Sequence, residues 1–250
     1  MLTFAIEVAR QAGGFITDAS CDDLCVEHKG RIDLVTRIDK GAQDIIICEI
    51  LQRFPDHAIL AEEGFERPGH SPYQWIIDPL DGTTNFVHDL GMYCVSIAVY
   101  KDKVPYIGVC YNPVNDMLFS AQAGKGAFLN GSPLKVSQTK RLVDSLVATG
   151  FPYTHENIED ITARLSRVIR STQGIRRLGS AALDLCHVAA GVFEGFYEEG
   201  LHPWDMAAGV LILKEAGGRV TSMNQGAFDL YEGSILASNS LIHSELGRLM

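Results

Sequence analysis

The segment 75–86, Trp-Ile-Ile-Asp-Pro-Leu-Asp-Gly-Thr-Thr-Asn-Phe, constrains this chain more than any other stretch of it. It opens with a short apolar run at 75–77, which predicts a buried strand. The strand is expected to end on Asp78, because Pro79 stops sheet pairing and fixes a turn. Asp81 follows Asp78 by three residues, so a tight turn would aim both carboxylates at one point.

The residues after Asp81 indicate what such a pair of carboxylates would bind. Gly82 allows close approach of the backbone to a ligand, and Thr83 onward predicts a helix whose free N–H groups would hold an anion. Carboxylates and a bound anion repel each other unless cations lie between them. Oxygen ligands favour Mg²⁺ over zinc. The segment therefore predicts a metal-bridged phosphate. The alternative is that Asp81 and Gly82 form only a turn and that Asp78 is a cap.

Length and charge set the broad class of the protein. A chain of 250 residues buries a substantial core, as one large domain or two small ones. A hydrophobic fraction of 46% with 21% charged residues is typical of a soluble globular protein, and no apolar run reaches membrane-spanning length. The net charge of −10 disfavours nucleic-acid binding, and it disfavours phosphate binding unless cations reverse the local field. The cysteines form no CxxC pair, which predicts reduced thiols in a cytoplasmic protein.

The first part of the chain predicts helices at 2–18 and about 40–54, with a polar, mobile loop over 19–31. Asp39, taken alone, is most simply the N-cap of the second helix. A buried strand is expected at 58–61, and Glu62 and Glu63 lie just past its end. A carboxylate pair at the C-terminal end of a strand is a common place for a site, and the alternative is a solvated surface loop.

The rest of the chain falls into two patterns. Strand-like segments at 93–100, 106–111, 117–121 and 127–130 predict antiparallel hairpins, with 124–126 as a turn rather than a phosphate loop. Beyond them, strands alternate with helices at 157–170, 179–190 and 205–216. The first of these helices is expected to turn five side chains inward: Ile158, Ile161, Leu165, Val168 and Ile169. We therefore expect an N-terminal lobe, 1–133, carrying most metal ligands, and a C-terminal lobe, 134–250, completing the site.

One further acidic residue comes late in the chain. Asp205, in the segment Trp-Asp-Met-Ala-Ala-Gly at 204–209, fits a helix N-cap, and an Asp at a helix start can also bind a metal. His202 is expected to be a structural histidine, since nothing else here indicates nitrogen ligation.

Three segments together resemble the inositol monophosphatase family, part of the lithium-sensitive, magnesium-dependent phosphatase superfamily. They are Glu62-Glu63, Asp-Pro-Leu-Asp-Gly-Thr-Thr-Asn-Phe at 78–86, and Trp-Asp-Met-Ala-Ala-Gly at 204–209. The resemblance covers nearly the whole chain. It implies a mixed α/β fold, a layered αβαβα sandwich with an antiparallel N-terminal sheet and a smaller C-terminal α/β lobe. It also implies a homodimer.

The resemblance also implies roles for individual residues. Metal binding would fall to Glu62, Asp78, Asp81, Asp205 and the backbone carbonyl of Leu80. Water activation would fall to Glu62 and a pair formed by Thr83 and Asp39. Substrate would meet the phosphate-contacting amides of Gly82 and Thr83, the substrate-facing segment with Ser180 and Ala181, Asp205, and Glu198, which contacts hydroxyls. The loop around His28 and Lys29 departs from the family pattern.

The function that follows is Mg²⁺-dependent hydrolysis of a phosphate monoester, in first place inositol 1-phosphate, by a metal-activated water. The same chemistry on fructose 1,6-bisphosphate, a nucleotide 3′-phosphate, NADP or histidinol phosphate stays open, because fold does not fix substrate. A regulator or scaffold that binds a protein or RNA partner is the alternative of another class.

Overall fold

The computed structural model describes residues 1–18, 37–152 and 157–250, and also the backbone of 27–28 and 34–35. Its helices are α1 (Leu2–Asp18), α2 (Arg37–Arg53), α3 (Thr83–Val87), α4 (Ile158–Ser171), α5 (Ala181–Ala189), α6 (Pro203–Glu215), α7 (His243–Gly247) and the 3-10 turn η2 (Leu142–Asp144). The loop predicted over 19–31, with Lys29, lies largely outside the described residues. A short antiparallel pair, β1 (Glu27–His28) and β2 (Leu34–Val35), flanks part of this region.

The larger sheet has eight strands in the order β10-β9-β8-β7-β6-β5-β3-β4. Their bounds are β3 (Ala58–Ala61), β4 (Glu66–Arg67), β5 (Tyr73–Asp81), β6 (Cys94–Lys101), β7 (Val104–Asn112), β8 (Met117–Gln122), β9 (Ala127–Leu129) and β10 (Ser132–Pro133). The predicted hairpins of this region are confirmed. The sheet is mixed rather than antiparallel throughout, because β4 turns the chain back before β5 begins and β5 therefore runs parallel to β3.

The smaller sheet has five strands in the order β12-β11-β13-β15-β14. Their bounds are β11 (Leu146–Thr149), β12 (Gly174–Arg176), β13 (Gly195–Glu199), β14 (Arg219–Thr221) and β15 (Ser234–Ser238). β11 runs parallel to both of its neighbours, and β15 runs antiparallel to β13 and β14.

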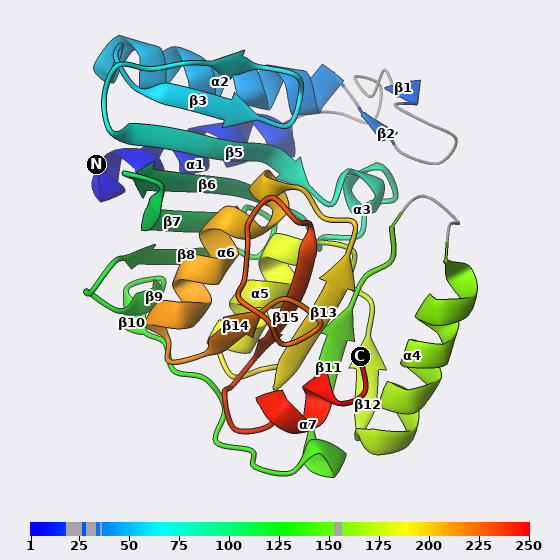
Figure 1. The fold of residues 1–250 in the computed structure, drawn as a ribbon. Coiled ribbons are helices and arrows are strands. Elements are labelled where there is room, and N and C mark those ends of the chain that lie inside the picture. Colours follow the sequence, from blue (N-terminus) through cyan, green and yellow to red (C-terminus); the bar gives the residue numbers. More distant parts are fainter. Residues whose placement is uncertain (19–26, 29–33, 36, 153–156) are drawn as a thin grey trace.

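Alternating apolar side chains bury both faces of each sheet. In the larger sheet, Ile77 and Ile97 pack with α1 and α2, whereas their neighbours Ile76 and Ala98 pack with α5 and α6. In the smaller sheet, Ala148 packs with α5 and α6, and Val147 on the opposite face packs with α4 and α7. The layers are therefore αβαβα, with α5 and α6 between the sheets (Figure 1), as the family resemblance implies.

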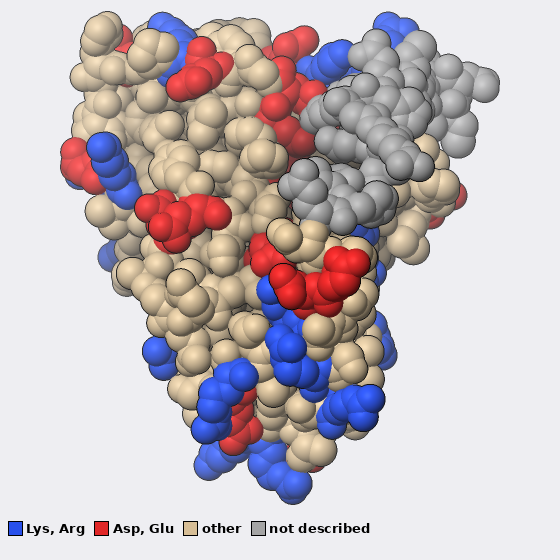
Figure 2. Space-filling model, turned by 45° about the vertical axis from the view of Figure 1, so that its right-hand side comes forward, with Lys and Arg blue, Asp and Glu red and all other residues tan. Residues whose placement is uncertain are grey.

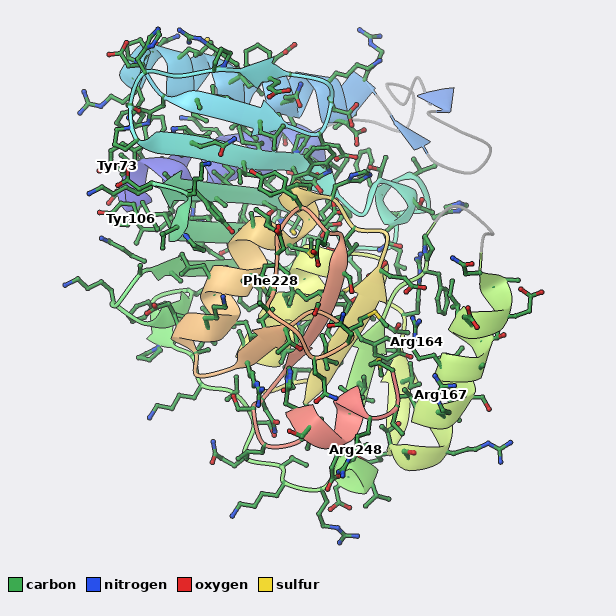
Figure 3. All side chains as sticks on the ribbon, in the orientation of Figure 1. Tyr73, Tyr106, Arg164, Arg167, Phe228 and Arg248 are labelled. Atoms are coloured by element: carbon green, nitrogen blue, oxygen red, sulfur yellow. The ribbon has the colours of Figure 1, made fainter. Side chains whose placement is uncertain are left out.

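Helix α4 corrects one prediction about inward side chains. Ile161 and Val168, seven residues or two turns apart, are buried, but Ile158 is 42% exposed and Ile169 is 57% exposed. The helix lies at the edge of the smaller sheet and buries only a narrow stripe. Arg167 extends from α4 to the C-terminal segment (Figure 3), where its Nε donates to the Leu249 carbonyl over 2.7 Å.

The structure also describes the cysteines and the apolar character of the helices. The cysteines that the structure describes are free thiols, namely Cys48, Cys94, Cys110 and Cys186. No helix among the described residues has the length and apolar character needed to cross a membrane.

Candidate active site

A β-bulge at the end of β5 positions the first two carboxylates. Asp78 pairs with Ser96 and Asp81 pairs with Cys94, so three steps along β5 match two steps along β6. Side chains three residues apart on a regular strand point to opposite faces of the sheet. The extra residue of the bulge turns the side chains of Asp78 and Asp81 to the same face. The strand therefore continues past Pro79 to Asp81 instead of stopping there, because a bulge tolerates a residue without an N–H donor. The Asp78 Oδ1 accepts from the Leu80 N–H over 3.0 Å, which fixes the turn of the chain.

Gly82 and Thr83 come directly after the bulge. Gly82 has a φ of 98°, and a Cβ there would lie 3.0 Å from the Met92 carbonyl oxygen, so the position requires glycine. Thr83 begins α3, which has only five residues. The Oγ1 of Thr83 lies 2.8 Å from Asp39 Oδ1 and 3.2 Å from the Leu80 carbonyl oxygen.

Asp39 is a partner of Thr83 and is not an N-cap. Helix α2 begins at Arg37, so Asp39 is its third residue, and its side chain is fully buried. The structure therefore brings together the Thr83–Asp39 pair that the family resemblance implies, across 44 positions of the chain.

Glu62 directly follows β3, which runs parallel to β5. Its N–H donates to the Ile77 carbonyl over 3.1 Å, so the chain stays beside β5 for one residue past the strand. The buried Gln43 of α2 holds the next residue, because its Oε1 accepts from the Glu63 N–H over 2.9 Å. These bonds set Glu62 near Asp78, with which its side chain shares a hydrogen bond.

Helix α5 holds Asp81 from the other side. The Asp81 Oδ2 accepts from the Ser180 hydroxyl over 2.5 Å and from the Ala182 N–H over 2.8 Å. Ser180 is also the N-cap of α5, since its Oγ accepts from the Leu183 N–H. The Ser180 hydroxyl, which the resemblance assigns to substrate, thus already bonds a carboxylate of the site.

Asp205 lies in the first turn of α6, three residues after its N-cap. The N-cap is His202, Pro203 fills the first helical position, and the Asp205 Oδ2 accepts from the His202 N–H over 2.7 Å. Asp205 is therefore not itself the N-cap. The exposed His202 ring stacks on Trp204 with 4.8 Å between ring centroids, and His202 does not line the cavity described next.

These residues line one cavity between the two sheets. Of the residues to which the family resemblance assigns a role, all line it except Asp39, which contacts it through Thr83: Glu62, Asp78, Leu80, Asp81, Gly82, Thr83, Ser180, Ala181, Glu198 and Asp205. Glu198 arrives from β13 and lies against Gly150, where a Cβ would come within 2.0 Å of its Oε1. Figure 2 shows Asp and Glu gathered near the middle of one face, with Lys and Arg more numerous toward its lower end.

The carboxylates of the cavity are strongly affected by burial and by one another. Burial, and after it the charges of Glu62, Asp81 and Asp205, raise the pKa of Asp78 well above its usual range. Burial raises the pKa of Asp81 to about 7, against the opposing effect of its hydrogen bonds. Burial also raises the pKa of Glu198 to about 8. Repelling, buried carboxylates are costly to ionise unless a cation joins them.

The donor set fits a hard divalent cation. Glu62, Asp78, Asp81 and Asp205 offer oxygen atoms only, and no salt bridge in the described part of the chain joins the three aspartates to Lys or Arg. The side chains are not already drawn together around one point: within the described ranges, no three His, Cys, Asp or Glu side chains are grouped to hold a metal.

Sequence reasoning missed several residues of the cavity, of which Asp184 and Arg177 carry charge. Asp184 follows Ser180 by four residues, so the helical repeat alone places both on the same side of α5 and could have indicated it. Arg177 lies in the loop before α5, and no repeat indicates where it points.

Comparison with known proteins agrees with this geometry. Residues 1–249 match the model of the inositol monophosphatase family. An inositol-1-monophosphatase of Synechocystis is 44% identical over 100% of this chain and 88% of its own length, and the Nus factor SuhB of Pasteurella multocida is 42% identical over 98% of this chain and 94% of its own. The crystal structure of the extragenic suppressor protein suhB from Bartonella henselae superposes with a TM-score of 0.96 at 40% identity, covering 99% of this chain and 96% of that chain. The chain therefore belongs to the inositol monophosphatase family, a generally metal-dependent group, and is a phosphoric monoester hydrolase.

Proposed function

We propose that the protein hydrolyses polyol phosphate monoesters with Mg²⁺, in first place inositol 1-phosphate to inositol and phosphate. The observation that carries this proposal is the Thr83–Asp39 pair, at 2.8 Å, beside four carboxylates that line the same cavity. The name of the Synechocystis relative, inositol-1-monophosphatase, supports the choice of ester.

The metal would be held by the carboxylates of Glu62, Asp78, Asp81 and Asp205 and by the Leu80 carbonyl. When bound, Mg²⁺ supplies positive charge that offsets the phosphate dianion and lowers the pKa of a water molecule. Ser180 and the Ala182 N–H hold one Asp81 oxygen in place, which leaves the other oxygen for coordination.

The protein's own groups orient and deprotonate the attacking water. Thr83 donates its hydroxyl hydrogen to Asp39, so the oxygen of Thr83 keeps a lone pair that accepts from water. The released proton passes to Glu62, or through the Thr83 hydroxyl to Asp39. The water oxygen bonds to phosphorus as the ester P–O bond breaks, and the leaving alkoxide takes up a proton. No covalent enzyme intermediate is part of this proposal.

The substrate would lie between the two sheets. Its phosphate would accept from the backbone amides of Gly82 and Thr83, with Asp205 beside it, and Ala181 would face the ester at the start of α5. Glu198, across the cavity on β13, would accept from hydroxyls of the polyol.

Phosphate release from a panel of esters tests this function. The panel holds inositol 1-phosphate, fructose 1,6-bisphosphate, 3′-phosphoadenosine 5′-phosphate, NADP and histidinol phosphate, each with Mg²⁺ and with EDTA. We expect Mg²⁺-dependent release that is fastest from inositol 1-phosphate. Faster release from another ester would keep the metal chemistry and change the substrate.

A regulatory role is a second candidate, favoured by the name Nus factor SuhB of a relative that is 42% identical. If the protein binds Mg²⁺ but releases phosphate from none of the esters, the regulatory role would be favoured over the enzymatic function. We further propose a cytoplasmic homodimer and a division into lobes 1–133 and 134–250, which rest on the family resemblance and on the sequence pattern.

A further inference from the structure

Asp184 is a buried carboxylate that the mechanism above does not use. It lies in the first turn of α5, is 1% exposed, and lines the same cavity as the carboxylates proposed to bind the metal. Its Oδ1 has no hydrogen-bond partner among the described residues. A buried carboxylate oxygen without a hydrogen-bond partner destabilises a fold, so an oxygen of this kind at a cavity wall points to a ligand.

The surroundings of Asp184 indicate what kind of ligand this is. Ser180, one helical turn earlier, points at Asp81, so Asp184 lies about 6 Å farther along α5 from the reacting phosphate. The charges that act on Asp184 are those of Glu198, Asp81 and Arg177, all of which line the same cavity. Two carboxylate acceptors and a guanidinium donor thus line the part of the cavity that would hold the alcohol half of an ester.

We propose that Asp184 is a second hydroxyl-binding carboxylate that, with Glu198, selects esters carrying neighbouring free hydroxyls. This inference rests on the proposed function and specifies its substrate class. Two adjacent hydroxyls would donate one hydrogen each to Asp184 and Glu198, and Arg177 would donate to a hydroxyl oxygen. A site built to bond hydroxyls rejects an analogue that lacks them, because its buried acceptors then stay unpaired.

A matched pair of esters tests the proposal. Inositol 1-phosphate and cyclohexyl phosphate share a six-membered carbon ring and differ in their free hydroxyls. The readout is the kcat/KM for inositol 1-phosphate divided by the kcat/KM for cyclohexyl phosphate, in the presence of Mg²⁺.

We expect Asp184→Leu to lower this ratio at least about tenfold, through a higher KM for inositol 1-phosphate. Asp184→Asn keeps an acceptor oxygen and should give an intermediate ratio. Asp44→Leu, at an exposed position of α2, is the matched control and should leave the ratio as it is.

Stability separates this role from a structural one. Because Leu replaces a buried carboxylate, one oxygen of which has no hydrogen-bond partner, with an apolar group of similar size, the melting temperature should stay equal or rise. An unchanged ratio in both variants, or an equal loss on both esters, overturns the proposal. If Asp184→Leu does not fold, the ratio of kcat/KM values for the two esters in Asp184→Asn decides between the two roles.

Failure of the proposed function would look different. In that case the unaltered protein would release phosphate from neither ester. Calorimetric binding of inositol 1-phosphate with Mg²⁺ then tests Asp184 alone: weaker binding by Asp184→Leu supports the proposal, and equal binding overturns it.

Discussion

Asp81 links the two halves of the site through one carboxylate. Its Oδ2 accepts from Ser180 and Ala182, 99 and 101 positions later, so the end of β5 and the start of α5 are held together. Because Ser180 and Ala182 donate to it and its charge has no Lys or Arg partner among the described residues, its negative charge is available to a cation.

Asp81→Asn tests that charge. The amide keeps the size of the side chain but removes the charge, so we expect kcat to fall by about a thousandfold or more while the melting temperature changes little. Assays of phosphate release and circular dichroism measure the two effects. Asp116→Asn is the control, since Asp116 is exposed and has a positive φ that Asn also adopts. Turnover near normal in Asp81→Asn would contradict the metal assignment.

Thr83→Val tests the proton path. Valine keeps the shape of threonine but lacks the hydroxyl, so we expect kcat to fall about a hundredfold while KM changes little. Thr83→Ser restores the hydroxyl that contacts Asp39 and should recover most of the rate. A rate near normal in Thr83→Val, or a loss in Thr83→Ser as large as the loss in Thr83→Val, would contradict the proton path.

At this scale the sequence predicts residue identity better than residue geometry. Asp39 and Asp205 were both expected as possible N-caps, yet each is the third residue of its helix, because Arg37 and Pro203 extend the helices toward the N-terminus. The spacing of four residues from Ser180 places Asp184 on the same side of α5, but no local pattern reveals that its Oδ1 is buried without a partner.

Among the elements, β5 and its bulge set the geometry of the site. A proline in a strand usually marks its end, and that rule placed the end of β5 at Asp78. The structure instead absorbs Pro79 in a bulge, which restores Asp78 and Asp81 to one side. Whether Pro79 lies in a bulge or in a turn depends on the pairing of Asp78 with Ser96 and of Asp81 with Cys94 on β6. The local sequence does not reveal this pairing.

Gly82→Ala tests the turn that follows the bulge, and Gly131→Ala is its matched control. Both glycines have positive φ, 98° and 80°, but a Cβ at 82 meets the Met92 carbonyl at 3.0 Å and one at 131 meets nothing within 4 Å. The left-handed backbone alone should cost about 1–2 kcal/mol of unfolding free energy in each variant. Gly82→Ala should lose a further ~1–3 kcal/mol from the close contact, and should lose activity as Thr83 shifts. Equal denaturant midpoints in the two variants would contradict this account.

On the scale of the whole molecule, periodicity predicts individual strands and helices, and the family resemblance implies how they are layered. Alternation along β6, β7 and β11 and the helical pattern of α1 and α5 are local properties, whereas the order of the αβαβα layers is not. The parallel pairing of β3 with β5 and the contact of Ser180 with Asp81 are long-range, and only the folded structure reveals them.

The buried carboxylates make the stability of the metal-free protein depend on pH. Folding raises the pKa of Asp81 to about 7 and that of Glu198 to about 8, so the folded protein keeps protons that the unfolded chain has released. Stability therefore falls as pH rises from about 4 to 8. In EDTA we expect the melting temperature to drop over this range, and Mg²⁺ should raise it more at pH 8 than at pH 5. Equal stabilisation by Mg²⁺ at both values would show that the cation binds elsewhere.

The central claim is that the carboxylates of this cavity hold Mg²⁺ for phosphate ester hydrolysis. The most direct test is the rate of phosphate release from inositol 1-phosphate by protein stripped with EDTA, before and after Mg²⁺ is restored, in the unaltered protein and in Asp81→Asn. The account predicts no release before restoration, full recovery in the unaltered protein, and no recovery in Asp81→Asn. Release by the stripped protein, or recovery in both proteins alike, would contradict it.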